Sequence, residues 1–77
     1  MQLNKIMKSE LTITSGMGHE NGFVYDIHLK DADGYENTYS VTHVHGKWYI
    51  TEEVDIESRF GKKLIEHVNV HRQTILN

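Results

Sequence analysis

The chain of 77 residues contains no cysteine and no proline. Without cysteine it can form neither a disulfide framework nor a zinc site with thiolate ligands, and both absences suit a reducing cytoplasm. No apolar run approaches the ~20 residues that a helix needs to span a membrane. The first residues, MQLNKIMKSELTI, lack the continuous apolar stretch and the small-residue cleavage site of a secretory signal. We therefore expect a cytoplasmic protein with no membrane-spanning segment.

The length and composition indicate one small folded domain that comprises residues 1–77. Charged residues make up 25% of the chain and hydrophobic residues 38%, which is typical of a globule rather than of a disordered chain. Residues 1–8 are expected to be a frayed start or a short helical turn. The net charge of −3 argues against broad, charge-driven binding to nucleic acid, which requires a basic surface.

Three turn signals punctuate the N-terminal two thirds of the chain, and each contains a glycine beside other turn-forming residues. The motif DADGY predicts a three-residue hairpin loop at residues 32–34, with the glycine in the left-handed region. By the same pattern, HENGF predicts a three-residue loop at residues 20–22. For VHGKW we predict a two-residue loop at residues 45–46. These loops would join four strands.

The loops also fix which residues lie opposite each other in neighbouring strands. Tyr25 is predicted opposite Val41 and also opposite Met17, while Ile13 is predicted opposite Leu29. A slip of one residue would turn a strand inside out, so the register can be tested against the sequence. The large apolar residues then share one face: Leu11, Ile13, Met17, Phe23, Tyr25, Ile27, Leu29, Tyr39, Val41, Trp48 and Ile50. The other face collects threonine and charged residues, which favours an antiparallel sheet with one solvent-exposed side.

The C-terminal segment carries apolar residues at helical spacing: Ile56, Phe60, Leu64, Val68 and Ile75. Thr51 or Asp55 is predicted to cap the start of a helix that runs to about residue 74. Gly61 should weaken this helix by ~1 kcal/mol relative to alanine. A helix that ends near Glu66, followed by a fifth strand, is the alternative for residues 67–76. The predicted fold class is α+β: a four-stranded antiparallel β-meander with a C-terminal α-helix packed across one face.

Six histidines are the unusual feature of the composition. His43 is predicted to lie on the apolar face between Phe23 and Trp48, while His67 and His71 are four residues apart on the helix. The three imidazoles could converge to bind a transition metal, since three histidines and a water form a known zinc site. A histidine-based pH sensor is a second possibility. The simpler interpretation is structural packing of half-buried imidazoles, so we expect no cofactor.

No arrangement of residues in the sequence indicates catalysis. There is no cysteine nucleophile and no serine in an elbow motif. The segment SGMG lacks the GK[ST] of a phosphate-binding loop, and DADG is too short for a calcium-binding hand. Asp26, His28 and Ser40 would share one sheet face, but an open face has no pocket that excludes water. We therefore expect a protein that is not an enzyme.

A small domain of this kind usually acts through its surface. Our first hypothesis is a cytoplasmic interaction protein, such as a regulator, an inhibitor or a small subunit. Its contact surface would be an apolar strip of Val24, Val44 and Tyr49 on the outer face of the sheet, and the partner would be another protein or a second copy in a homodimer. The edge strand from Leu11 to Met17 is another possible contact.

Nucleic-acid binding is a further alternative. A sheet followed by a C-terminal helix is also the architecture of some DNA-binding modules, although architecture alone does not define function. The phosphate contacts would come from the basic residues of the predicted helix: Arg59, Lys62, Lys63 and Arg72.

Overall fold

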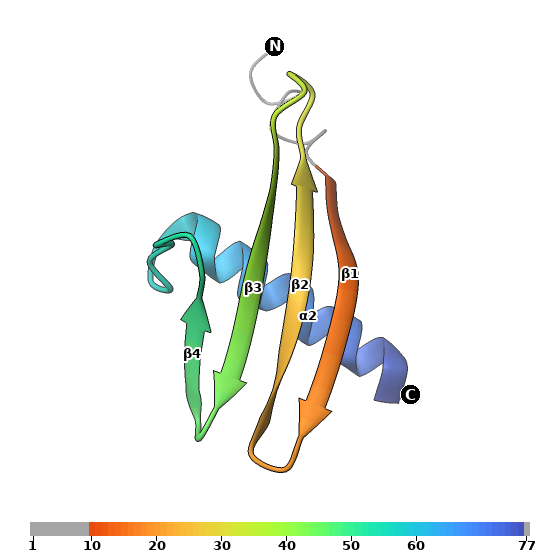
Figure 1. Cartoon of the computed structure of the whole chain (residues 1–77), viewed down its shortest axis with the longest axis vertical. Coiled ribbons are helices and arrows are strands. Elements are labelled where there is room, and N and C mark those ends of the chain that lie inside the picture. The colour runs from red at the N-terminus through yellow and green to blue at the C-terminus, as the bar shows by residue number, and fades with distance from the viewer. Residues whose placement is uncertain (1–9, 77) are drawn as a thin grey trace.

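The computed structural model describes residues 10–76, which form one antiparallel sheet and one helix (Figure 1). The elements are β1 (Glu10–His19), β2 (Gly22–Lys30), β3 (Glu36–Val44), β4 (Lys47–Ile50) and α2 (Arg59–Leu76). The strands lie in the order β1-β2-β3-β4, and α2 crosses one face obliquely from the β4 side to the β1 side. This confirms the predicted α+β fold. The prediction for residues 1–8 lies outside the described residues.

The second and third hairpins have the predicted loops and register. Tyr25 pairs with Val41 across β2 and β3, and Lys30 pairs with Glu36 at the ends of these strands. Gly34 in the intervening loop has a φ of 89°, as the motif DADGY requires. In the loop between β3 and β4, His45 and Gly46 have φ values of 51° and 77°, and this left-handed pair matches the twist of the flanking strands.

The first hairpin differs from the prediction. His19 pairs with Gly22, so the loop has two residues rather than three. A β-bulge between Ile13 and Ser15 then shifts the register by one residue. The predicted pairs of Met17 with Tyr25 and of Ile13 with Leu29 are therefore wrong.

The observed pairs show what the bulge achieves. Gly16 lies opposite Tyr25 on the face that α2 covers, and a β-carbon at Gly16 would overlap the Tyr25 ring. Met17 pairs with Val24 on the opposite face and has 67% of its surface exposed. The shorter loop and the bulge together place Gly16, rather than a residue with a side chain, opposite Tyr25, and this leaves room for the Tyr25 ring. Ile13 still lies on the covered face, because it pairs with Ile27.

The glycines of β1 provide a direct test of this register. The Gly16→Ala substitution is expected to destabilise the fold by about 1–3 kcal/mol, because the new methyl group would collide with the Tyr25 ring. The Gly18→Ala substitution is the matched control, since nothing lies within 4 Å of the added atom. Urea unfolding followed by the fluorescence of Trp48 measures both. Equal effects of the two substitutions would contradict the bulged register.

The helix begins later than predicted, because the two expected caps have other partners. Ser58 is the N-cap: its Oγ accepts a hydrogen bond of 3.0 Å from the Gly61 backbone N–H. Thr51 instead extends the sheet, and its Oγ1 accepts a hydrogen bond of 2.8 Å from the Ser40 N–H. Asp55 closes a separate turn, in which its Oδ1 accepts the Glu57 N–H at 2.9 Å. The helix continues to Leu76, two residues beyond the predicted end at about residue 74, and residues 67–76 form no strand.

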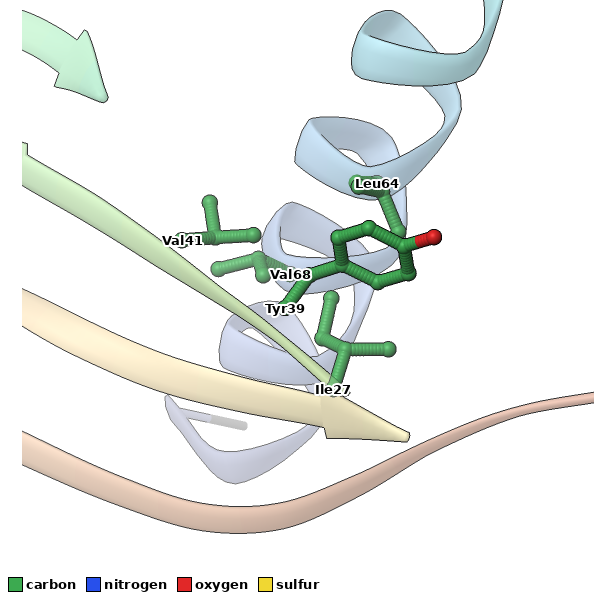
Figure 2. Packing of buried hydrophobic residues seen from close by; sticks show 5 residues of the cluster. All are labelled: Ile27, Tyr39, Val41, Leu64 and Val68. Atoms are coloured by element: carbon green, nitrogen blue, oxygen red, sulfur yellow. The ribbon is translucent and has the colours of Figure 1, made fainter. Parts of the chain in front are cut away.

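The core lies between the sheet and α2 (Figure 2), where the fully or almost fully buried side chains are Ile27, Tyr39, Val41, Leu64 and Val68. The rings of Tyr39 and Phe60 meet edge to face with centroids 5.2 Å apart. Burial raises the pKa of Tyr39. The predicted helical stripe is thus confirmed for Phe60, Leu64 and Val68; Ile56 precedes the helix, and the Ile75 side chain lies outside the described part.

Candidate interaction surface on the open face of the sheet

The face of the sheet opposite α2, here called the outer face, carries four apolar side chains near one end, with Thr42 among them. Met17, Val24, Thr42 and Tyr49 lie opposite one another in a single row across all four strands. Val44 follows Thr42 by two residues on β3 and therefore shares the same face. We call Met17, Val24, Val44 and Tyr49 the outer apolar patch. Tyr49 is 53% exposed, while Val24 and Val44 are half-buried.

The structure thus places the three predicted contact residues, Val24, Val44 and Tyr49, on one face. Sequence reasoning assigned Met17 to the opposite face and missed its place in this patch. The alternation of β1 gives no sign of the bulge. The signal that could have revealed it is Gly16, because a glycine opposite the large ring of Tyr25 is a typical way to relieve crowding in a sheet.

A strip of polar side chains runs across the sheet beside the outer apolar patch. Ser15, Asp26 and Ser40 lie opposite one another in the next row. The Asp26 carboxylate accepts hydrogen bonds from Ser40 Oγ at 2.6 Å and from Ser15 Oγ at 2.8 Å. These bonds, chiefly that from Ser40, lower the pKa of Asp26. The carboxylate is therefore held in place and negatively charged next to the patch.

Asp26 should make the stability of the fold depend on pH. Because the pKa of Asp26 is lowered from its ordinary 3.8, its carboxylate stabilises the folded chain above that pH and loses the effect as the pH falls through the lower folded pKa. At pH 7 the free energy of unfolding of the wild-type protein should be higher than that of an Asp26→Asn variant. The difference should be less than about 1 kcal/mol, because water screens the site. Urea unfolding at pH 7 and at about pH 2 measures the gap. A gap of equal size at both pH values would contradict the assignment.

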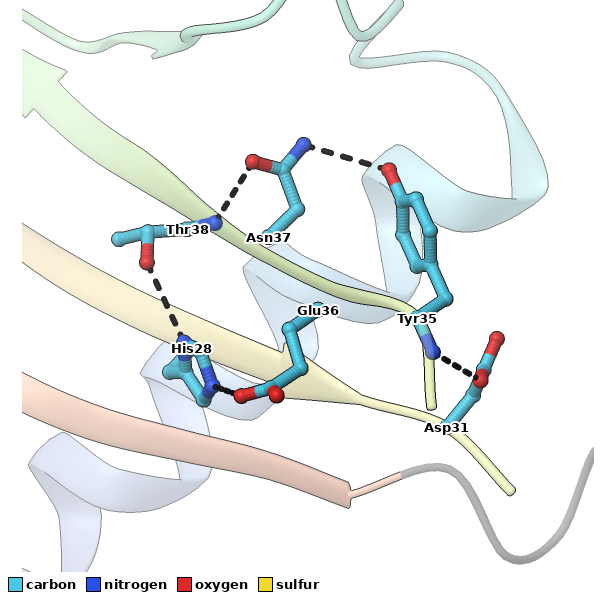
Figure 3. A network of polar contacts seen from close by, with 6 residues as sticks. All are labelled: His28, Asp31, Tyr35, Glu36, Asn37 and Thr38. Atoms are coloured by element: carbon cyan, nitrogen blue, oxygen red, sulfur yellow. Dashed lines mark hydrogen bonds and ion pairs between the residues drawn. The ribbon is translucent and has the colours of Figure 1, made fainter. Parts of the chain in front are cut away.

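The end of the outer face away from the patch is polar and charged (Figure 3). His28 Nε2 lies 2.9 Å from Glu36 Oε1, and His28 Nδ1 lies 3.3 Å from Thr38 Oγ1. The adjoining loop is held by Asp31, whose Oδ1 accepts the Tyr35 N–H at 2.9 Å. Among the described residues, the outer face therefore changes along the strands, from apolar near the β1–β2 loop to polar and charged near the β2–β3 loop.

The histidines of the proposed metal site are engaged with aromatic rings on the covered face. His43 stacks on Phe23 with ring centroids 5.3 Å apart and lies 4.5 Å from the Trp48 ring, as the register predicts. His71 packs edge-on against Tyr25 at 5.5 Å. His67 is half-buried on α2.

The geometry does not gather these three histidines into a metal site. Among the described residues, no group of three or more histidine, cysteine, aspartate or glutamate side chains could hold one metal ion. The arrangement of His43 and His71 is that of amphipathic rings packed at the margin of a core.

The basic residues of the proposed nucleic-acid surface are also separated. Arg59, Lys62 and Lys63 are exposed in the first turns of α2. Arg72 lies about 14 Å beyond Lys63 and about 20 Å beyond Arg59 along the helix axis, given the rise of ~1.5 Å per residue. Its guanidinium stacks 3.9 Å from the centroid of the Phe23 ring, and its Nη1 donates a hydrogen bond of 3.4 Å to the Tyr25 hydroxyl. Arg72 therefore fastens α2 to the sheet.

Comparison with models of protein families, with curated proteins and with solved structures finds no match to this chain. Within residues 10–76, no helix has the length and apolar character of a membrane span. The assignment of function must therefore come from the surface of the molecule itself.

Proposed function

We propose that this chain is a small cytoplasmic protein without catalytic activity that binds another protein through the outer apolar patch. The observation that carries the proposal is the row of Met17, Val24, Thr42 and Tyr49 across the whole sheet, which α2 leaves uncovered. Scattered exposed apolar residues are normal on a protein surface, whereas a contiguous group rimmed by polar residues marks a contact site.

The composition of the patch also supports this role. Tyrosine and methionine are enriched at the centres of protein interfaces, where a ring or a thioether is desolvated at little cost. The Asp26 carboxylate beside the patch accepts hydrogen bonds from two serine hydroxyls. It supplies a fixed charge at the rim of the patch, which can select the orientation of a partner. The roles of regulator, inhibitor and small subunit all require only such a surface.

Affinity capture from a lysate of the native host tests the proposal. The baits are the wild-type chain, a Tyr49→Lys variant and a Val70→Lys variant. Val70 is a matched control, because it is 55% exposed on α2 against 53% for Tyr49 on the sheet. A charge in the middle of an apolar contact is costly when it is desolvated without a partner.

The proposal predicts at least one captured protein that is retained by the wild type and by Val70→Lys but lost with Tyr49→Lys. The chain's own wild-type copy counts as such a protein. A capture pattern that is the same for all three baits would contradict a role for the outer face, as would the absence of any retained protein.

A further inference from the structure

The loop between β1 and β2 contains Asn21 followed by Gly22, the only place in the chain where a glycine follows an asparagine. Asn21 is exposed in the two-residue loop, and Gly22 is the first residue of β2. In such a pair the backbone nitrogen of the glycine can approach the carboxamide carbon of the asparagine, because glycine has no side chain to obstruct it. The loop therefore places a nucleophile and a reactive carbonyl group next to each other.

The packing of the sheet requires the glycine at position 22. A β-carbon there would overlap the backbone carbonyl oxygen of His43 on the neighbouring strand β3. Gly22 also pairs with His19 on one side and with Val44 on the other, so its backbone cannot move away without disturbing two ladders. The fold thus excludes at this position the bulkier residues that would hinder attack on the Asn21 carboxamide.

The Asn21 carboxamide is not restrained by its surroundings. Within residues 10–76 it makes no hydrogen bond; the backbone carbonyl oxygen of Asn21 instead accepts the His45 N–H at 3.2 Å. By contrast, the carboxamide oxygen of Asn37 accepts the Thr38 N–H at 2.9 Å. The ends of hairpins open locally at little cost in free energy, and such an opening lets the Asn21 carboxamide turn towards the Gly22 nitrogen.

From this arrangement we propose that Asn21 is a site of spontaneous deamidation. The Gly22 backbone nitrogen loses its proton to solvent and forms a bond to the carboxamide carbon, while the carboxamide nitrogen takes up a proton and leaves as ammonia. Water then adds to either carbonyl carbon of the resulting cyclic imide and opens the ring. Opening on one side gives aspartate, and opening on the other gives isoaspartate, whose backbone is longer by one methylene group. The net change is the loss of ammonia and the uptake of water.

The reaction alters the end of the sheet that carries the outer apolar patch, because Gly22 pairs with the patch residue Val44. Both products are ionised carboxylates at neutral pH, so each adds −1 to the net charge of −3. Isoaspartate also displaces the carbonyl group that accepts the His45 N–H, which ties the β1–β2 loop to the β3–β4 loop. The change is one-way, because the ammonia is lost to dilute solution. It requires no partner and is therefore independent of the proposed function.

Ageing of the purified chain at mildly alkaline pH tests the proposal. Trypsin cleaves after lysine and arginine, which separates the asparagines into residues 9–30 with Asn21, residues 31–47 with Asn37 and residues 64–72 with Asn69. The last two peptides are internal controls, because a β-branched residue follows each asparagine and hinders the attack. Mass spectrometry should find deamidation in residues 9–30 at least about tenfold more often than in either control peptide.

An Asn21→Gln variant is the matched control for the chemistry. It keeps an exposed amide at the same position, but its longer side chain requires a larger and less favourable ring, so residues 9–30 should stay unmodified. The wild-type peptide should give two products of equal mass that separate by chromatography, since the imide opens on either side. Equal deamidation in all three peptides would overturn the proposal, as would residues 9–30 that react only when the protein is unfolded in urea. A single aspartate product would overturn the imide route.

An Asn21→Asp variant separates the effect of the charge from that of the longer backbone. It carries the added charge on an ordinary backbone and should keep the urea midpoint of the wild type, because Asn21 is exposed. The isoaspartate form, purified from the aged protein, should unfold at a lower urea concentration because it loses the bond to His45. An isoaspartate form as stable as the Asn21→Asp variant would contradict the assigned effect on the two loops.

Discussion

Replacing Gly61 with alanine is expected to destabilise the protein by about 2–3 kcal/mol, although alanine is the better helix former. Gly61 is buried in the first turn of α2, and an added β-carbon would overlap the carbonyl oxygen of Asp55. The carbonyl cannot move away easily, because it accepts hydrogen bonds from the Ser58 backbone N–H at 3.0 Å and from Ser58 Oγ at 2.6 Å. The close approach of the 55–58 turn to the helix thus requires glycine.

The sign of this effect makes the test decisive. Helix propensity alone gives a gain of ~1 kcal/mol for Gly61→Ala, whereas the packing gives a loss. Lys62→Ala, at the next and exposed position, is the control and should change the free energy of unfolding by less than about 0.5 kcal/mol. Urea unfolding of the two variants beside the wild type provides the comparison. A Gly61→Ala protein more stable than the wild type would contradict the turn geometry.

Replacing Leu64 with alanine is expected to cost about 3–4 kcal/mol. Leu64 is completely buried between α2 and the sheet, so its removal leaves a cavity that the neighbouring strands cannot close. A domain of this size has a total stability of only about 5 kcal/mol, and the variant should therefore be close to unfolding at room temperature. Circular dichroism during urea titration measures the loss.

The matched control for Leu64→Ala is Val70→Ala. Both substitutions shorten an aliphatic side chain on α2, but Val70 is 55% exposed while Leu64 is not exposed at all. The expected change for Val70→Ala is within about 0.5 kcal/mol. Similar losses for the two variants would contradict the assignment of the face by which α2 packs on the sheet.

Much of the fold could be predicted from the sequence, because local and global signals agree. The loops DADGY and VHGKW fix the register of β2, β3 and β4, and this register places Ile27 and Val41 under the helix. The spacing of Leu64 and Val68 predicts the buried face of α2. Where two independent patterns demand the same arrangement, few alternatives remain.

The start of the helix was predicted wrongly because one side chain could bond to either of two partners. Thr51 and Ser58 are both suitable helix caps, and only the tertiary structure shows that Thr51 instead bonds to Ser40. Glu52 and Glu53 follow with φ values of 65° and 56°, which no glutamate pattern predicts, since residues with side chains seldom adopt the left-handed region. The connection from β4 to α2 is therefore determined by packing rather than by local preference.

The candidate surface was only partly visible in the sequence for a related reason. Alternation placed Val24, Val44 and Tyr49 on the outer face, but the bulge in β1 changed the side on which Met17 lies. A bulge alters the register without changing the composition of a strand, so alternation cannot detect it. The spacing of the histidines in the sequence suggests a metal-binding cluster that the structure does not form. The rings of Phe23 and Trp48 occupy the space around His43.

The valine methyl groups offer the most direct test of the outer face as the contact surface. NMR spectra of valine-labelled protein, recorded with a soluble paramagnetic agent, report the solvent access of each methyl group. At low concentration, Val24 and Val44 should be broadened while the buried Val41 and Val68 are not. When the protein captured from the host lysate is added, Val24 and Val44 should become protected, and Val70 on α2 should stay accessible. Protection of Val70 instead, with no change at Val24 and Val44, would contradict the account.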